Sequence, residues 1–184
     1  MKGRYGIFGG QYVSELLMPA LIELEEAFER HYPTDEFQSE YKQLLHDYAG
    51  RETPLYHAKN FSEIIGTKVY LKREDLVHGG SHKLNNTLGQ ALLAKKMGKK
   101  RVITETAAGQ HGLATIMACN ILGIEPHIYI GYKDIIRQAS NVKKMKLLGG
   151  IIHKVEIGKG VLKDAVSDTL RERTKCSRDT IYLM

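Results

Sequence analysis

The pattern of hydrophobic and polar positions changes at about residue 68. From there on, short runs rich in β-branched residues alternate with longer stretches whose apolar side chains recur near the 3.6-residue period of a helix. The expected strands are 68–72, 101–105, 127–130, 151–155 and 180–183, and the expected helices are 83–97, 110–122, 134–148 and 161–174. Glycines follow three of these helices, as is typical of helix ends. The alternation predicts an α/β fold with right-handed βαβ units on a parallel sheet.

The first 50 residues have a different pattern. Two amphipathic stretches, 16–30 and 35–48, are separated by a short segment that contains Pro33, with no strand pattern between them. They predict a helical N-terminal segment, 1–50, that precedes the sheet. At the other end, 180–184 is apolar and no helix follows it. Because a parallel sheet normally has both faces covered, either this edge strand packs against another element or the chain is the front part of a longer protein.

Composition narrows the class of protein. Of the 184 residues, 42% are hydrophobic and 26% are charged, which is ordinary for a folded soluble protein. The two cysteines, Cys119 and Cys176, lie far apart without metal-ligand spacing, so we expect no disulfide framework, no metal site and a reducing compartment. Residues 1–10 contain no apolar leader and no window approaches the roughly 20 apolar residues of a membrane span. We therefore expect a cytoplasmic protein without a membrane partner.

The net charge of +6 does not by itself indicate nucleic-acid binding. The basic clusters, 95–101 and 143–146, fall late in predicted helices, where cations interact favourably with the negative end of the helix dipole. No aromatic residues interleave with them, as a stacking platform for single strands would require. We expect these clusters to be solvated helix ends and expect no nucleic-acid partner.

A first candidate for chemistry is the glycine-containing loop 77–82, which runs directly into a predicted helix at Lys83. Such a loop places backbone N–H groups and the positive helix end where an anion can bind. A lysine at this end opposes the dipole, which favours the neutral amine and makes Lys83 a candidate nucleophile toward a carbonyl, such as an aldehyde cofactor. The alternative is an exposed loop lysine beside a structural His82.

A second candidate is the segment 104–112, where small residues leave a predicted strand and enter a helix. Ligands of open α/β sheets bind at the carboxyl ends of strands, and successive N–H groups here could hold a substrate carboxylate. Glu105 is placed for proton transfer, or is a capping or salt-bridging carboxylate. The remaining candidates are weaker: His127 and His153 fall in strand patterns as core or edge residues, and 158–160 matches neither dinucleotide-binding nor P-loop motifs.

Taken together, these loops and several further segments resemble, in order, the β subunit of tryptophan synthase. The matching motifs are Gly9-Gly10-Gln11-Tyr12-Val13, Arg51-Glu52-Thr53-Pro54-Leu55, Lys72-Arg73-Glu74-Asp75-Leu76, His82-Lys83-Leu84-Asn85-Asn86 and Glu105-Thr106-Ala107-Ala108-Gly109-Gln110-His111-Gly112. The last two are highly specific. The similarity runs over essentially the whole chain but matches only the N-terminal half of the family. It implies the fold type II of enzymes that use pyridoxal 5′-phosphate (PLP), and a β-replacement in which indole replaces the hydroxyl of L-serine to give L-tryptophan.

The resemblance also implies roles for individual residues. Lys83 matches the lysine that holds PLP and later moves the Cα proton, and Glu105 matches the acid that assists hydroxyl departure and indole attack. His82 and Gln110 match residues that contact the cofactor. The loop matching the one that binds the serine carboxylate comprises Thr106, Ala107, Ala108, Gly109, Gln110 and His111.

The resemblance further implies a division of the chain and its partners. Residues 51–99 correspond to the region of the PLP lysine, and 100–184 to a mobile communication region that faces the tryptophan synthase α subunit. Arg137 and Lys163 match positions of inter-subunit signalling, and the complete protein is expected to form a homodimer of the β type.

Departures from the family pattern limit what this chain is expected to do alone. Ala107 stands where the family usually has glycine, which could tighten the loop if the position needs a positive φ. The family's phosphate-binding loop, the group facing the pyridine nitrogen and the whole C-terminal domain would lie beyond Met184. Residues 51–81 belong with that domain in the family, so here they lack a packing partner. The alternative function is a non-catalytic fragment that retains an α-subunit docking surface.

Overall fold

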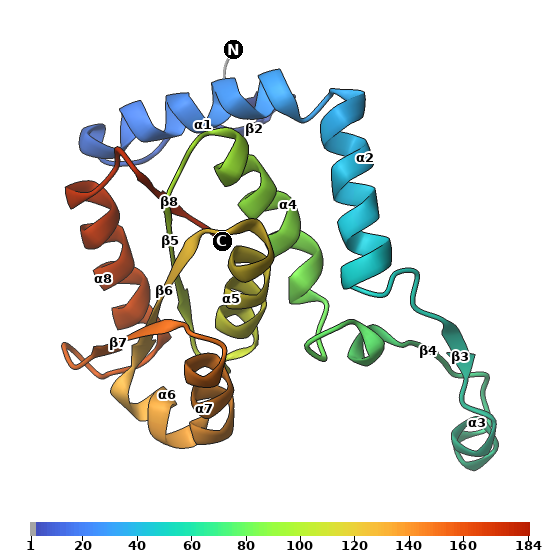
Figure 1. Cartoon of the computed structure of the whole chain (residues 1–184). Helices are drawn as coiled ribbons and strands as arrows, with labels where there is room; N and C mark the ends of the chain where they lie inside the picture. Colours follow the sequence, from blue (N-terminus) through green and yellow to red (C-terminus); the bar gives the residue numbers. More distant parts are fainter. Residues whose placement is uncertain (1–2) are drawn as a thin grey trace.

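The computed structural model of the chain describes residues 3–184 and contains a central sheet of four parallel strands in the order β7-β6-β5-β8 (Figure 1). The strands are β5 (Arg101–Thr106), β6 (Glu125–Gly131), β7 (Ile151–Val155) and β8 (Thr180–Tyr182). The helices that connect them are α5 (Gln110–Leu122), α6 (Tyr132–Arg137), α7 (Ala139–Leu147) and α8 (Leu162–Lys175). The α/β fold with a parallel sheet that the sequence predicts is therefore confirmed.

Helices cover both faces of this sheet. Helix α8 packs on one face, and α5 packs on the other with α4 (Lys83–Lys96) against it (Figure 1). Ile103 and Tyr129 point toward α8, whereas Val102 and Ile128 point into the larger core beneath α4 and α5. The two central strands are consequently buried on both sides, which explains their nearly continuous apolar sequence.

The two predicted N-terminal helices are confirmed. They are α1 (Met18–His31) and α2 (Asp35–Gln43), and α2 continues as the π-helical turn η2 (Leu44–Tyr48). The Thr34 hydroxyl caps α2 by accepting a hydrogen bond from the Phe37 N–H at 3.2 Å. Short elements that the sequence did not predict precede them: β1 (Arg4–Tyr5), β2 (Phe8–Gly9) and η1 (Glu15–Leu17). Both α1 and α2 pack against α4, which joins the helical segment to the core.

The prediction of one continuous helix over 134–148 is wrong. The chain forms α6 and α7 with a break at Gln138, whose φ of −114° and ψ of 33° lie outside the helical region. A tertiary contact accompanies the break, because the Asn141 side chain at the start of α7 donates a hydrogen bond to the Ala108 carbonyl at 2.8 Å. Hydrophobic periodicity cannot predict such a contact, because the loop is distant in sequence.

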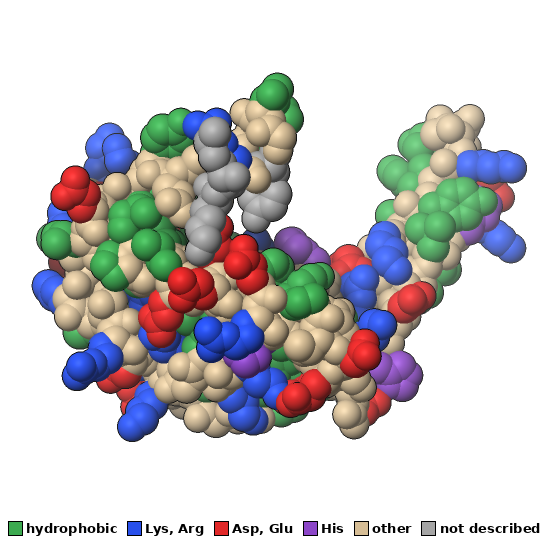
Figure 2. All heavy atoms as spheres, turned by 90° about the horizontal axis from the view of Figure 1, so that it is seen from above, with side chains coloured by type: hydrophobic (Ala, Val, Ile, Leu, Met, Phe, Trp, Pro, Cys, Tyr) green, Lys and Arg blue, Asp and Glu red, His purple; other side chains and the backbone are tan. Residues whose placement is uncertain are grey.

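The predicted strand 68–72 exists but does not join the parallel sheet. Strand β4 (Tyr70–Lys72) pairs antiparallel with β3 (Leu55–His57), and α3 (Lys59–Ile65) connects the two. With η3 (Glu74–Leu76), these elements form an arm, residues 51–76, that projects from the body of the molecule (Figures 1 and 2). The assignment to a βαβ unit is wrong because β3, a three-residue strand nearby in sequence, is the pairing partner of β4.

Strand β8 forms one edge of the sheet and is held there by α4. The Gln90 side chain donates a hydrogen bond to the Met184 carbonyl at 2.6 Å and accepts one from the Met184 N–H at 3.1 Å. Ile181 and Leu183 are buried. The edge strand thus packs against another element, as one of the two interpretations of the sequence expected. Within residues 3–184, no helix combines the length and apolar character needed to cross a membrane.

Candidate active site

The two candidate segments meet at the carboxyl end of the sheet. Lys83 is the first residue of α4, and the loop after β5 leads into α5. His111 lies near Lys83 and the Leu183 backbone, and Glu105 lies near Tyr182. Neighbouring residues at the end of β8 therefore lie beside the segment 104–112, and His111 of that segment lies near Lys83.

Packing of α4 against α5 holds the backbone of Lys83 in place. The buried Thr87, one turn further along α4, donates a hydrogen bond from its hydroxyl to the Ala114 carbonyl of α5 at 3.2 Å, and Leu84 is buried. In the described part of the chain, the Lys83 amine has no hydrogen-bond or ion-pair partner. His82, the N-cap residue of α4, is exposed and forms no side-chain cap. The helix thus fixes the backbone of Lys83 and leaves its amine free to react.

The loop after β5 is held from two directions. The Thr106 hydroxyl accepts a hydrogen bond from the Gly109 N–H at 3.1 Å, while Asn141 holds the Ala108 carbonyl. Gly109 has a φ of +85°, and a Cβ there would lie 2.6 Å from the Asn141 Cβ, so the position requires glycine. No non-glycine residue among 3–184 has a positive φ, so Ala107 fits the loop without backbone strain. The concern that Ala107 tightens the loop is not supported.

Several buried polar atoms around this loop have no partner among the described residues. They are Glu105 Oε2, Gln110 Oε1 and both ring nitrogens of His111. An unpaired buried polar group costs about 1–3 kcal/mol, so their concentration within seven residues indicates a place for a polar ligand. The first N–H groups of α5 also point out of the helix and are available to an anion.

Burial favours the neutral form of the His111 ring. It lowers the pKa of His111, the Lys83 charge lowers it further, and a contact with the Leu183 backbone acts in the opposite direction. Glu105 has no ion-pair partner in the described structure, which argues against the interpretation as a salt-bridging residue. A neutral imidazole, a free amine and an unpaired carboxylate can together bind a carbonyl compound and transfer protons.

Other sequence candidates lie outside this arrangement. His127 and His153 are structural, as expected: their rings stack with centroids 5.0 Å apart and share a hydrogen bond of 2.8 Å under α8. Arg137 forms an ion pair with Asp134 within α6, and Lys163 is exposed on α8. Their expected part in inter-subunit signalling stays a prediction.

The structure also reveals residues that sequence reasoning missed. Asn141 shapes the loop, Tyr182 faces Glu105, and Asn85 donates a hydrogen bond to Glu74 of the arm at 3.2 Å. Asn85 is a polar residue within the His82-Lys83-Leu84-Asn85-Asn86 motif, so the sequence contained a signal for it. Tyr182 had no such signal, because its place beside β5 depends on the strand order.

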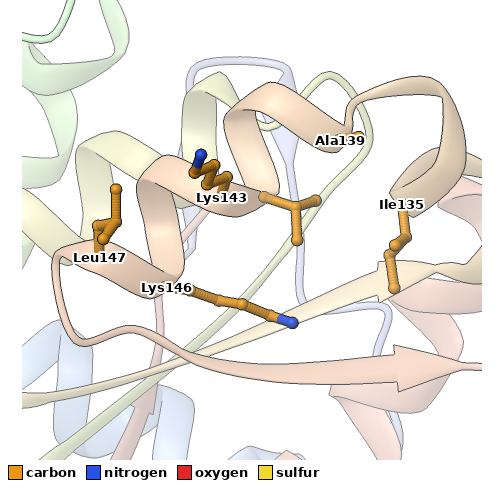
Figure 3. A pocket seen from close by; sticks show the side chains of 6 residues that line it. Ile135, Ala139, Lys143, Lys146 and Leu147 are labelled. Atoms are coloured by element: carbon orange, nitrogen blue, oxygen red, sulfur yellow. The ribbon is translucent and has the colours of Figure 1, made fainter.

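A surface cavity of about 430 Å³ lies apart from these residues, on α6 and α7 (Figure 3). Its lining consists of Ile135, Ala139, Val142, Lys143, Lys146 and Leu147, none of which the sequence predicts for the site. The Lys143 and Lys146 side chains extend from α7 at its border (Figure 3).

Comparisons with known proteins show the family of the chain. The model of the family described as pyridoxal-phosphate dependent enzyme matches residues 47–183, so the chain belongs to this family of enzymes, whose cofactor is PLP. Over all 184 residues the chain is 55% identical to tryptophan synthase beta chain 1 of Methanosarcina acetivorans. It covers 46% of that relative and thus spans about half of its length.

Solved structures support the fold. Maize serine racemase aligns with a TM-score of 0.61 at 22% identity over 82% of this chain and 43% of that protein. Serine racemase from Dictyostelium discoideum aligns with a TM-score of 0.58 at 18% identity over 88% and 46% of the two chains. These similarities confirm the PLP fold type II architecture that the sequence motifs imply.

The residues present fit the reactive end of PLP. Lys83 offers an unpartnered amine for the cofactor's aldehyde, and the His111 ring, whose nitrogens have no partner among the described residues, lies near Lys83. That Lys83 holds the cofactor, with His82 and Gln110 in contact with it, stays a prediction.

Proposed function

We propose that this chain forms the N-terminal part of a tryptophan synthase β subunit, which replaces the hydroxyl of L-serine by indole to give L-tryptophan. The observation that carries the proposal is the unpartnered Lys83 amine at the start of α4, beside a loop of unpaired buried polar atoms. The 55% identity to a tryptophan synthase beta chain supports this choice of reaction within the family.

The proposed mechanism divides the work among a few groups. When bound, PLP would supply an electron sink for negative charge at the serine Cα. Lys83 holds the cofactor and moves the Cα proton. The N–H groups of the loop 106–111 bind and orient the serine carboxylate. Glu105 gives a proton to the departing serine hydroxyl and then takes one as indole attacks.

The neutral state of His111 suits this division. A charged imidazole beside Lys83 would repel the protonated amine and so hinder proton transfer by Lys83. The neutral ring does not have this effect. The loop stays in position because Asn141 and Thr106 hold its backbone. Substrate orientation of this kind contributes to rate by pre-arranging the reacting atoms.

The proposal includes the partners of the complete enzyme. Groups for the PLP phosphate and the pyridine nitrogen come from the family's C-terminal half, and the complete β subunit forms a homodimer. The tryptophan synthase α subunit docks against the region 100–184 and supplies indole, with Arg137 and Lys163 in signalling between the subunits.

Two preparations test the function: the chain alone, and a fusion of this chain to the C-terminal part of the Methanosarcina relative. Each is incubated with PLP, reduced with borohydride and mapped by peptide mass spectrometry, and the fusion is assayed for tryptophan from serine and indole. We expect PLP to be fixed on Lys83 and the fusion to form tryptophan. Lys83→Ala should abolish both, while Lys163→Ala, on the exposed surface of α8, should leave PLP attachment intact.

The outcomes separate the candidate functions. PLP attached elsewhere than at Lys83, or tryptophan formed by the Lys83→Ala fusion, contradicts the proposal. Binding of an α subunit by the chain, with no turnover by a folded, PLP-loaded fusion, supports the non-catalytic docking fragment instead.

A further inference from the structure

Two histidines meet beneath α8, on adjacent strands of the sheet. His127 of β6 pairs in register with Ile151 of β7, and His153 lies two residues further along β7, so both histidines share one face of the sheet. His127 Nδ1 and His153 Nε2 lie 2.8 Å apart, at hydrogen-bond distance. The His153 ring also stacks on Tyr129, with centroids 4.5 Å apart. The histidine contact therefore ties the edge strand β7 to its neighbour β6 through side chains.

A carboxylate fixes which nitrogen of His127 carries a hydrogen. Glu125 Oε1 lies 2.6 Å from His127 Nε2, and an ionised carboxylate can only accept a hydrogen bond. His127 Nε2 therefore carries a hydrogen and donates it to Glu125. In the neutral ring the other nitrogen, Nδ1, then has no hydrogen. The bond between the two histidines consequently requires that His153 Nε2–H is the donor and His127 Nδ1 the acceptor.

One added proton reverses this bond without breaking it. His153 is partly exposed, and within residues 3–184 its Nδ1 has no hydrogen-bond partner, which leaves that nitrogen available to a proton from solvent. When His153 Nδ1 gains a proton, His153 Nε2 can pass its own hydrogen to His127 Nδ1. His127 is then the charged ring, which donates to Glu125 through Nε2 and to the bare His153 Nε2 through Nδ1. His153 is again neutral, with its hydrogen on Nδ1.

A second proton has no such arrangement. With both rings charged, the N–H of His127 Nδ1 would face the N–H of His153 Nε2 across 2.8 Å, so the bond would be replaced by repulsion between two cations. Tyr129 cannot offset this charge, because burial and the charge of Glu172 raise the pKa of Tyr129 to about 12 and keep it neutral. The geometry therefore accommodates one extra proton on the pair and not two.

The charged groups around the pair act in both directions. Burial lowers the pKa of His153, and the charge of His127 lowers it further. Arg101 of β5 acts in the same direction, whereas Glu172 and Asp168 of α8 oppose it. Arg101 and Glu172 form an ion pair at 3.0 Å, which weakens the influence of both on the histidines. The pKa of His153 stays below its usual value, in agreement with the geometry.

We propose that His127 and His153 form a one-proton switch: the folded chain takes up a single proton at this pair, which reverses their hydrogen bond, and a second proton breaks it. The side-chain link between β6 and β7 is thus sensitive to acid. The backbone hydrogen bonds between the two strands remain, so the effect is on the stability of the sheet and not on the presence of its strands. The inference is independent of the proposed function, because neither histidine belongs to the candidate active site.

The number of protons is measured in the chain as it is. Long-range ¹H–¹⁵N NMR spectra report which ring nitrogens carry a hydrogen, and the rings are assigned by correlation to their own backbone resonances. At pH 7.5 we expect both His127 and His153 to carry a hydrogen on Nε2 alone. As the pH falls to 5.5 we expect His127 to carry hydrogens on both nitrogens and His153 to carry one on Nδ1 alone.

His46 is the matched control for this experiment. It is an exposed histidine whose Nδ1 lies 2.7 Å from Asp47 Oδ1, so it has a carboxylate neighbour but no second histidine in hydrogen-bond contact among the described residues. It should gain its proton in one step, with no change at another ring. A folded chain in which both His127 and His153 are charged at pH 5.5, or in which both are still neutral, overturns the proposal.

The consequence for stability is measured by urea unfolding between pH 7.5 and 5.5. Below about pH 6.5 the unfolded chain binds a proton at each histidine, whereas the folded pair binds one, so the pair should raise the unfolding constant by up to about tenfold per pH unit. His153→Gln should weaken this pH dependence, because the Gln amide can donate to His127 Nδ1 or accept from it. His46→Gln should leave it unchanged. Equal pH dependence in the wild type and a folded His153→Gln variant contradicts the acid-sensitive link.

Discussion

The arm and the parallel sheet differ in how far they bury their apolar side chains. In the sheet, Ile103 and Ile128 are completely buried, because helices cover both faces. In the arm, Phe61 and Ile64 are 53% and 80% exposed, and Figure 2 shows hydrophobic side chains along the projecting segment. A two-stranded hairpin is marginally stable by itself. The sheet supplies its own core, and the arm presents a surface suited to a further contact.

The candidate site lies where these two regions join. Glu74 of the arm accepts hydrogen bonds from Arg51, from Thr53 at 2.7 Å and from Asn85 at 3.2 Å. Asn85 is two residues after Lys83, in the first turn of α4. The position of the arm is therefore linked to the turn that carries the reactive lysine. That the arm packs against the family's C-terminal domain stays a prediction.

The largest expected effect is the difference in unfolding free energy between a substitution in the core and one in the arm. Ile116→Ala, at a fully buried position of α5, should lower the free energy of unfolding by about 3–4 kcal/mol through lost burial and a cavity. Ile64→Ala, in α3 of the arm, should change it by less than about 0.5 kcal/mol. Urea unfolding followed by far-UV circular dichroism measures both. Equal losses would mean that the arm is part of the cooperative core.

An intermediate effect compares two glycines with similar backbone angles. Gly109 of the site loop and Gly66, which ends α3, have φ values of +85° and +72°. A Cβ at Gly109 meets Asn141, whereas one at Gly66 meets no atom within 4 Å. Gly109→Ala should therefore destabilise the chain by about 2–3 kcal/mol and Gly66→Ala by about 1 kcal/mol or less.

The same urea experiment measures this pair of variants. A double variant, Gly109→Ala with Asn141→Ala, does not relieve the contact with the Asn141 Cβ and should stay destabilised, whereas Gly109→Ala with Asn141→Gly should recover part of the loss. If Gly66→Ala costs as much as Gly109→Ala, steric contact in the site loop is not the reason for the difference.

The smallest expected effect concerns the acid sensitivity of the junction. Hydrogen bonds from Thr53 above all, and from Arg51 and Asn85, hold the pKa of Glu74 below 4.5, although partial burial opposes them. Because the folded pKa is below the unfolded value, the stabilisation is complete above pH 4.5 and disappears as the pH falls through the folded pKa. We expect less than about 1 kcal/mol, since the carboxylate is partly exposed to solvent.

Amide ¹⁵N relaxation between pH 3 and 7 measures this effect. Arm residues should become more mobile as the pH falls below 4.5, while the strands of the sheet stay ordered. Glu74→Gln should remove the pH dependence. Asp75→Asn is the control, because the pKa of Asp75 is also lowered, but by its exposed pair with Arg73 and not by a contact with α4. An unchanged pH profile in Glu74→Gln would show that Glu74 does not anchor the arm.

Local sequence determined most of the secondary structure and the identity of the site segments. The 3.6-residue periodicity predicted α4, α5 and α8, and glycines marked the ends of α4 and α5, because both signals act within a few turns of one element. The motifs around Lys83 and Glu105 placed the candidate chemistry at strand ends and helix starts, since parallel strands present their carboxyl ends at one edge. These features depend on residues close together in the chain.

Only the tertiary structure decided which distant segments meet. The strand order places β8 beside β5 although 73 residues separate Thr106 from Thr180 along the chain, and so brings Tyr182 to Glu105 and Leu183 to His111. The tertiary structure also interrupts the predicted helix at Gln138 and pairs β4 with β3. No local pattern encodes these contacts, because they arise from packing and hydrogen bonds between segments that hydrophobic periodicity treats separately.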